Sequence, residues 1–506
     1  MNQRISHIKF EKIHFMKNHD SDLRQRLIES SQISNLVENN QPGELIKLLE
    51  QSFSFKETFN PNDLTDFFDI CFAPMLQNAV NKQDIDLYSF IDHQLFSKYI
   101  NKIEDIEWFK KSFNDVARYG IVLGHRIKSS FKPPKSSFYP NGINGIYKKI
   151  LFVIKGPFKL AHADVFSTFL NGLNKNNTKN IIVTVLFLDD AAKNFERVRV
   201  ISFQSIKTTK EKIRAYEELT HTQTFYNIIW IACIQNLPLY LSLKRSHLTS
   251  YWTMKRHSIA FRDIDKYATL FSTYKNKFNE GVFWYGGRCS IDLKEPTLLR
   301  KDLANKYPTL KKVLQNKGSV VFGSLARSQK YHEISYWEGV LKLLEIHTNA
   351  YFVYGHSGNT WSEEINKIIN NNPQKSRVVD VGWLNGDTRN IAQIFDIYLD
   401  TIPFGTGVPA AEAIMSGAAF VGTLSKINEE ASLVTLMSQA KGLDPTTECE
   451  QIGILAKFEK SIRLTNHLIL NTNDRKTINS NQKQILQESI TNKEDFTSDY
   501  MEYFCS

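Results

Sequence analysis

Cysteine is scarce in this chain of 506 residues, and its five cysteines lie far apart in the sequence. No CxxC pair and no cluster of cysteine with histidine occurs, which argues against a structural zinc site and against a disulfide framework. We therefore expect the protein to work in a reducing compartment, the cytoplasm. The five residues are Cys71, Cys233, Cys289, Cys449 and Cys505.

Long apolar runs are also missing. No run approaches the ~20 apolar residues that a helix needs to cross a bilayer, so we expect no transmembrane segment. The opening residues, MNQRISHIKFEKIHF, contain no apolar core followed by a cleavage site of small residues, and we expect no secretion signal. With 42% apolar and 23% charged residues, the composition is that of an ordinary globular protein of roughly two to four domains.

Acidic residues are fewer than basic ones, 53 against 63, which gives a formal net charge of +10. This balance suits an anionic ligand or surface, but a composition rich in Asn and Lys gives the same charge without any such role. No stretch interleaves basic and aromatic residues as nucleic-acid interfaces do. We therefore do not expect nucleic acid as a partner.

The most informative stretch runs from Asp396 to Gly422 and reads DIYLDTIPFGTGVPAAEAIMSGAAFVG. Its pattern predicts a buried strand, a turn of small and rigid residues, a helix that stops at Gly417, and a second strand. In a parallel sheet built from such units, ligands bind at the carboxyl ends of the strands. Backbone N–H groups of the turn favour phosphate, and Glu412 on the helix could accept hydrogen bonds from ribose hydroxyls.

A second turn of this kind lies upstream. After an apolar run that predicts a strand from Val320, the chain reads FGSLARSQK. A lone glycine-rich turn is weak evidence, because any α/β protein contains one. Two such turns in one domain, the second with Ser324, Arg327 and Lys330, favour a nucleoside diphosphate as the ligand.

Together, FGSLARSQK and DIYLDTIPFGTGVPAAEAIMSG resemble the C-terminal half of GT-B glycosyltransferases. The resemblance is strongest to family 41, which holds the protein O-GlcNAc transferases and the bacterial cytoplasmic N-glucosyltransferases, and it covers roughly residues 318 to 425. It implies transfer of a sugar from a UDP-sugar, with inversion at the anomeric carbon, to an acceptor that could be a protein or peptide side chain.

The resemblance also implies roles for single residues. Lys330 falls where the family's lysine contacts the donor diphosphate, and Arg327 replaces a glutamine of the family. Glu412 falls, in place of an aspartate, where a carboxylate holds the ribose. The polar donor loop of the family falls at Gly405, Thr406, Gly407, Val408 and Pro409. This departure removes most side-chain donors, so we expect backbone amides of this donor loop to cover the phosphates.

Residues 1–140 predict a helical N-terminal domain, because apolar residues recur there at three- and four-residue spacing. The helices are expected at 21–37, 43–53, 62–80, 84–99 and 104–119. Such a domain either docks an acceptor or partner or covers the catalytic domains. A stretch with proline, serine and glycine, 129–147, predicts a linker.

Residues 148–292 alternate strands with helical stretches, which predicts a Rossmann-like domain. Strands are expected at 150–154, 181–188 and 237–243, a helix at 165–173, and either a helix or a strand at 226–234. By the GT-B resemblance this domain forms the acceptor side of a cleft. His162, after the first strand, is our candidate general base because an imidazole titrates near neutral pH. Asp164 is the rival base, and a capping or surface role for His162 is the alternative.

Two further stretches could face that cleft. Residues 246–259 are basic and aromatic, and His257 is our candidate for a histidine that family 41 carries on a loop. A solvated basic helix explains the same pattern. The sequence FWYGGR at 283–288 would line the cleft or act as a hinge.

Residues 293–506 predict a second Rossmann-like domain, with strands from 320 and at 350–354, 378–381, 397–399 and 419–421. By the resemblance, backbone groups of Trp383 and Asn385 would meet the uracil edge, while a core tryptophan is the alternative. A terminal helix would cross back to the first Rossmann-like domain. We therefore expect an α/β protein of GT-B fold, with two facing Rossmann-like domains preceded by an all-α domain.

No pair of aspartates follows a strand in the manner of a metal site; Asp189–Asp190 and Asp263–Asp265 are weak candidates. We therefore expect no metal and no cofactor apart from the UDP-sugar substrate. Helix dipoles and Lys330, assisted by Arg327, would stabilise the leaving diphosphate instead.

Two other functions compete with a transferase. The chain could be a non-catalytic nucleotide-sugar-binding partner of another glycosyltransferase, because its donor loop lacks polar side chains. A basic scaffold or nucleic-acid protein is suggested by charge alone.

Overall fold

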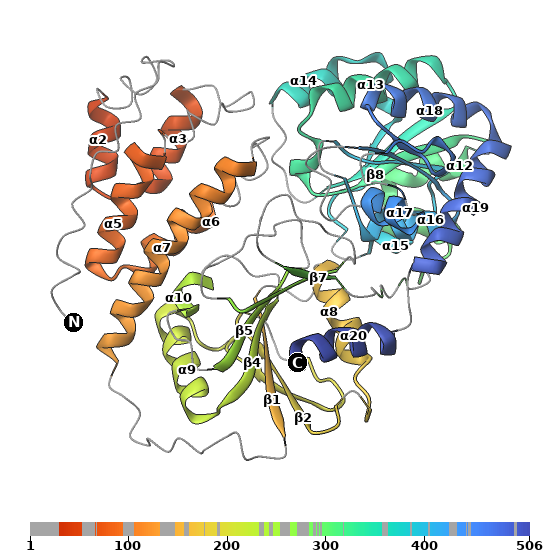
Figure 1. Ribbon diagram of the computed structural model, residues 1–506. Helices are drawn as coiled ribbons and strands as arrows, with labels where there is room; N and C mark the ends of the chain where they lie inside the picture. Colours follow the sequence, from red (N-terminus) through yellow and green to blue (C-terminus); the bar gives the residue numbers. More distant parts are fainter. Residues whose placement is uncertain are drawn as a thin grey trace. The chain divides into compact units, whose positions relative to one another are not determined.

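The computed structural model, drawn in Figure 1, divides into two units, Met1–Arg126 and Ile127–Ser506, which we describe separately. It describes residues 30–52, 66, 68–94, 106–131, 147–155, 161–176, 178–189, 193–231, 237–241, 246–253, 264–270, 283–286, 290, 293, 296–316, 318–356, 363–384, 387–402, 405–424, 433–441, 443, 447–489 and 493–506. Among the helices in these ranges, none combines the length and the apolar character that crossing a membrane requires.

The first unit is helical in its described part, as predicted. Its helices are α2 (Ser31–Glu38), α3 (Pro42–Ser52), α5 (Ala73–Lys82), α6 (Ile85–Gln94) and most of α7 (Ile106–Ser130), whose last turn belongs to the second unit, with a π-helical turn at Phe68–Phe72. The helix predicted to end at Tyr119 continues to Ser130. Interior glycines cost a helix about 1 kcal/mol each, but α7 carries Leu123 and Ile127, which are fully buried, and their packing offsets that cost.

The first sheet is parallel and has seven strands in the order β3-β2-β1-β4-β5-β6-β7. The strands are β1 (Lys148–Ile154), β2 (Ile181–Phe187), β3 (Val198–Ser202), β4 (Phe225–Ile231), β5 (Ser246–Trp252), β6 (Lys266–Thr269) and β7 (Trp284–Gly286). Helices α8 (Ala161–Asn171), α9 (Thr209–Thr222) and α10 (Leu237–Leu241) connect them. The order reverses between β1 and β4, as in a doubly wound fold.

One strand prediction in this region is wrong. Residues 237–241 form the short helix α10, in which every residue is buried. A fully buried run shows no period that separates helix from strand, and Pro238 cannot donate a hydrogen bond to a sheet. The open choice at 226–234 is decided in favour of the strand β4, and 246–252 is the strand β5.

Four strands of this sheet, β3, β5, β6 and β7, were not expected from the sequence; β3 is half-exposed, and β6 and β7 are short. β3 alternates a charged residue with valines and has no fully buried position. β7 falls on the stretch 283–286, where Trp284 is buried and Phe283 is exposed. Trp284 therefore packs in the sheet, while Gly287 and Arg288 lie outside the described residues.

The second sheet is also parallel, with six strands in the order β10-β9-β8-β11-β12-β13. Its strands are β8 (Val320–Leu325), β9 (Ala350–Gly355), β10 (Val378–Asp380), β11 (Ile397–Leu399), β12 (Ala419–Thr423) and β13 (Ile454–Leu455). Its helices include α13 (Ile334–Ile346), α14 (Glu363–Asn371), α15 (Thr388–Ala392), α16 (Val408–Ser416), α17 (Leu433–Ala440), α18 (Phe458–Leu470) and α19 (Thr472–Ser489). The strand order matches a dinucleotide-binding fold, and its reversal lies between β8 and β11.

Between residues 300 and 315 the chain forms short helical pieces instead of one continuous helix. They are a 3-10 turn at Arg300–Asp302, α11 (Leu303–Lys306), a second turn at Pro308–Leu310 and α12 (Lys311–Gln315). Pro308 explains the break, because a proline inside a helix removes a hydrogen bond and clashes with the preceding turn.

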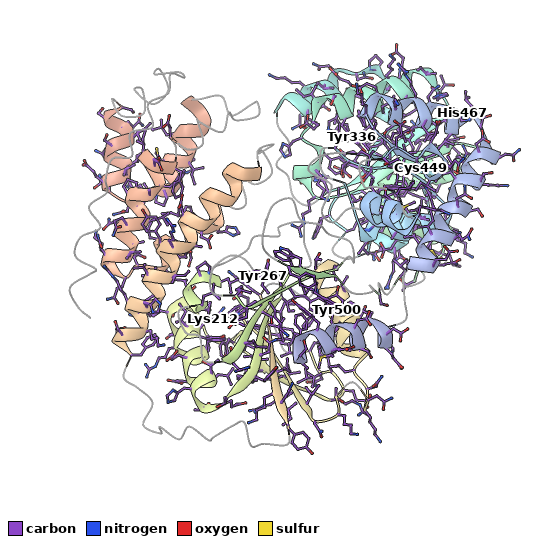
Figure 2. All side chains as sticks on the ribbon, viewed as in Figure 1. Lys212, Tyr267, Tyr336, Cys449, His467 and Tyr500 are labelled. Atoms are coloured by element: carbon purple, nitrogen blue, oxygen red, sulfur yellow. The ribbon has the colours of Figure 1, made fainter. Side chains whose placement is uncertain are left out.

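The last helix, α20 (Lys493–Cys505), packs against the first sheet rather than the second, as Figure 1 shows beside α8. Tyr500, labelled in Figure 2, stacks on Trp252 with ring centroids 4.4 Å apart and donates a hydrogen bond to the Thr269 carbonyl. Asn227 on β4 donates to the Phe504 carbonyl at 2.9 Å. The chain thus returns to the first sheet after completing the second.

Candidate functional site

The two turns singled out in the sequence follow neighbouring strands of the second sheet. One follows β8 and the other follows β11, and β8 and β11 are paired in parallel. The strand order reverses between these two strands. Open parallel sheets bind ligands at the carboxyl ends of the strands at such a reversal, so the fold brings the two predicted phosphate-binding turns to the place where a nucleotide is expected.

We call residues 326–331, which follow β8, the phosphate turn. Residues 328–331 form a 3-10 turn, closed by a hydrogen bond from the Lys330 amide to the Arg327 carbonyl of 2.9 Å. Arg327 is exposed and Lys330 is half-buried. The Lys330 Nζ donates a hydrogen bond to the Gly405 carbonyl at the start of the donor loop. Lys330 therefore extends from the phosphate turn to the donor loop, which is the geometry expected if a single ligand binds both turns.

Asp400, directly after β11, stabilises the donor loop through hydrogen bonds. Its Oδ1 accepts hydrogen bonds from the Thr401 amide at 3.1 Å and from the Thr406 amide and hydroxyl, each at 2.7 Å. Its side chain is almost fully buried, and its Oδ2 has no hydrogen-bond partner among the described residues. Burial raises the pKa of Asp400 to about 6, although Thr406 and the charge of Lys330 lower it.

The donor loop is shorter than predicted. Val408 and Pro409 already belong to α16, which begins two residues before the expected start because proline is favoured in the first turn of a helix. Gly407 precedes the helix, and a Cβ added there meets no atom within 4 Å. The Thr406 hydroxyl donates to Asp400, so the donors that this loop could offer to an anion are backbone amides at the N-terminus of α16.

Glu412 lies on α16 and is half-buried. Its Oε2 accepts a hydrogen bond of 2.6 Å from the Thr388 hydroxyl at the start of α15. Glu412, the residue predicted to bind the ribose, therefore has a hydrogen-bond partner within the protein, and this partner fixes the orientation of its carboxylate.

The other candidates on the second sheet are Ser324, Trp383 and Asn385, and the first two differ in burial. Ser324 is fully buried in β8, and its Oγ has no hydrogen-bond partner in the described part of the chain. Trp383 is 53% exposed, so the alternative of a core tryptophan is wrong. Asn385 lies outside the described residues.

The candidates on the first sheet are not brought to this site by anything the structure describes. His162 and Asp164 lie in the first turn of α8, rather than in a loop after β1. The positions of their side chains, and His257 as a whole, are outside the described part of the structure. Their roles stay predictions.

Of the weak metal candidates, Asp189 forms an ion pair with Lys212 and Asp265 accepts from the Thr249 amide at 2.7 Å. Within the described ranges, no three His, Cys, Asp or Glu side chains lie together as metal ligands would.

Sequence reasoning missed four polar residues of this edge: Ser328, His356, Asp380 and Asp400. Ser328 Oγ lies 3.4 Å from His356 Nδ1, and His356 Nε2 lies 3.0 Å from Asp380 Oδ2. A signal was present, because Asp400 and His356 each follow a buried strand directly.

Comparison with known proteins finds similarity in structure only. No protein-family model matches the chain, and no curated protein matches it in sequence. Among solved structures, a mutant of the Thermobaculum terrenum O-GlcNAc transferase is similar with a TM-score of 0.55 and 11% identity, covering 97% of this chain and 98% of that chain.

The Anabaena protein HepE is similar as well. Its complex with UDP and glucose has a TM-score of 0.52 and 13% identity, covering 71% of this chain and 100% of that chain. At this identity the similarity bears on the fold alone. With two parallel, doubly wound sheets and these structural neighbours, the chain has the GT-B glycosyltransferase fold that the sequence predicted.

Proposed function

We propose that this protein is a glycosyltransferase that moves a sugar from a UDP-sugar to an acceptor, with a protein or peptide side chain as the acceptor class. Transfer would proceed without a metal and with inversion at the anomeric carbon. The proposal rests on the GT-B fold together with one observation at the second sheet. Lys330 of the phosphate turn reaches the donor loop at the point where the strand order reverses.

That observation matters because of what sugar transfer requires. When the bond to the sugar breaks, negative charge grows on the leaving diphosphate, and fixed positive charges or dipoles must stabilise it. The ammonium of Lys330 contacts Gly405, three residues before α16 begins, so this ammonium and the N-terminus of α16 would supply both kinds of group. Arg327, which is exposed on the same turn, would add a second positive charge.

The remaining roles follow from the family resemblance. Glu412 would hold the ribose once a ribose hydroxyl competes with Thr388 for its carboxylate. The turn with Trp383 and Asn385 would meet the base. His162, with Asp164 as the rival, would take the proton from the acceptor, and the N-terminal helices would dock it.

A second candidate function is supported by the donor loop. Thr406 has its hydroxyl bound to Asp400, and Gly407, Val408 and Pro409 bring no polar side chain. A loop of this kind could bind a nucleotide sugar through its backbone without accelerating transfer. The protein would then be a non-catalytic nucleotide-sugar-binding partner of another glycosyltransferase.

The first experiment is calorimetric titration of the protein with UDP, GDP and their sugar conjugates in the presence of EDTA. We expect UDP and a UDP-sugar to bind. Lys330→Ala should weaken binding roughly 10- to 100-fold, since a hydrogen bond to a charged group contributes about 1.5–3 kcal/mol. Lys342→Ala, which removes an exposed lysine of α13, is the matched control and should bind as the wild type does.

Absence of binding to every nucleotide would contradict both candidate functions. If UDP binds, release of UDP from UDP-sugars in the presence of peptide acceptors separates the two. Turnover that Lys330→Ala abolishes supports the enzyme, whereas tight binding without turnover supports the non-catalytic partner.

A further inference from the structure

Three side chains at the carboxyl edge of the second sheet form a chain of contacts that the proposed mechanism does not use. Ser328 belongs to the phosphate turn after β8, His356 follows β9, and Asp380 ends β10. The Ser328 Oγ lies 3.4 Å from His356 Nδ1, and His356 Nε2 lies 3.0 Å from Asp380 Oδ2. Ser328 and His356 are 2% and 6% exposed, so water competes little for the contact between them, whereas the Asp380 side chain is 43% exposed.

The hydrogen bonds among these three side chains have a defined direction. A carboxylate oxygen only accepts hydrogen bonds, so the proton of a neutral His356 must sit on Nε2 and point to Asp380. Nδ1 then accepts from the Ser328 hydroxyl. The His356 ring also stacks on Tyr354, with ring centroids 5.8 Å apart, which holds the plane of the imidazole.

Beyond Asp380 the contacts continue into the turn that follows β10, residues 381–384, which we call the base turn. Asp380 Oδ1 accepts a hydrogen bond of 2.7 Å from the Gly382 amide, and the Gly382 carbonyl accepts one of 3.1 Å from the His356 amide. Gly382 has a φ of +68°, a conformation that favours glycine. The base turn therefore has a shape set by Asp380 and His356.

We propose that His356 is a positioning residue that couples the phosphate turn to the base turn, so that the two ends of a nucleoside diphosphate are recognised as one ligand. This inference rests on the proposed function, because the two turns bind phosphate and base only under it. His356 itself touches neither part of the nucleotide. It holds one turn at a fixed distance from the other, and a rigid spacing raises the affinity for a ligand that spans both turns.

This role predicts a pattern of affinities that loss of stability would not produce. Uridine and pyrophosphate each use one turn, so they gain nothing from the spacing, whereas UDP uses both. Ser328→Ala and His356→Gln should each weaken UDP binding roughly tenfold and leave uridine and pyrophosphate within about twofold of the wild type. The double variant should be no weaker than either single one, because each substitution breaks the same connection.

The matched control is His347→Gln. His347 is also 6% exposed and has a side-chain partner, Asn466 at 2.8 Å, but it precedes β9 at the opposite edge of the sheet. We expect it to leave all three affinities unchanged. The proposal would be overturned if His356→Gln lowered the affinities for all three ligands equally, if the effects of the two substitutions added up in the double variant, or if UDP binding were unchanged.

A second measurement needs no ligand. Amide hydrogen exchange at Gly382 should become faster in Ser328→Ala, although Ser328 lies on the other turn, because the contact that orients His356 and Asp380 is lost. If wild-type protein binds no nucleotide, the proposed function fails, and unchanged exchange at Gly382 would still reject the coupling by itself.

Discussion

At the scale of single residues, Asp400 carries a carboxyl group whose burial disfavours its charged form. One carboxylate oxygen accepts three hydrogen bonds, while the other is buried without a partner in the described part of the chain. Burial raises the pKa of Asp400 from 3.8 to about 6. A buried polar atom without a partner costs free energy, so the shape of the donor loop is maintained at some expense of stability.

This shift predicts a pH dependence of stability. Because the folded pKa lies above the unfolded one, the folded state binds the proton more tightly, and stability falls as pH rises from about 4 to about 6. Above that window the charged form costs roughly 3 kcal/mol. Asp400→Asn removes this titration, so the wild type should lose Tm relative to the variant between pH 4.5 and pH 7.5.

The matched variant is Thr406→Val, which keeps the shape of the side chain and removes its hydrogen bond to Asp400. Since that bond lowers the pKa of Asp400, the loss of stability should extend to higher pH in this variant. A difference between the wild type and Asp400→Asn that does not change with pH would refute the assignment.

At the scale of elements, β8 and α16 depend on glycine for different reasons. Gly323 pairs with Val353 on β9, and a Cβ added there would lie 1.8 Å from the Val353 carbonyl oxygen. Gly417, which ends α16, has a φ of +114°, but a Cβ would meet nothing within 4 Å. The first position is limited by space and the second by backbone conformation.

These reasons predict costs of different size. Gly323→Ala must displace the backbone of β9 and should lower the free energy of unfolding by about 3 kcal/mol or more. Gly417→Ala bears only the conformational penalty, about 1 kcal/mol. Thermal unfolding followed by circular dichroism measures both. Equal losses in the two variants would show that β8 and β9 separate to make room.

At the scale of the whole molecule, α20 connects the end of the chain to the first sheet. Phe496, Tyr500 and Phe504 are fully buried there, in one core with Trp252 and Phe169. The preceding helix α19 packs instead on the second sheet, against β12 and α17. The C-terminal segment therefore contributes to the cores of both sheets, although the predicted nucleotide contacts belong to the second alone.

This division predicts that damage to α20 leaves nucleotide binding intact. Tyr500→Ala should destabilise the first sheet by about 3–5 kcal/mol and make α20 sensitive to a protease. Tyr500→Phe, the matched variant, loses only the hydrogen bond to Thr269 and should cost about 1 kcal/mol. Limited proteolysis and UDP titration measure the two effects, and loss of UDP binding in Tyr500→Ala would count against this separation.

The sequence alone determined the elements whose residues are strongly patterned. The strand 397–399 and the stop of α16 at Gly417 were predicted as observed, because a buried apolar run and a glycine after a helix are local signals. The same local signals identified Lys330 and the donor loop as a candidate site. Short or half-exposed strands such as β3, and the buried helix α10, gave no such signal.

Only the tertiary structure decided which polar groups act on one another. Residues 330 and 405, or 328, 356 and 380, are distant in sequence, and they meet because parallel strands end at one edge of a sheet. Likewise, the pKa of Asp400 is raised only because the folded protein excludes water from its carboxyl group. The local sequence shows that an aspartate follows a strand, but it does not show what surrounds that aspartate.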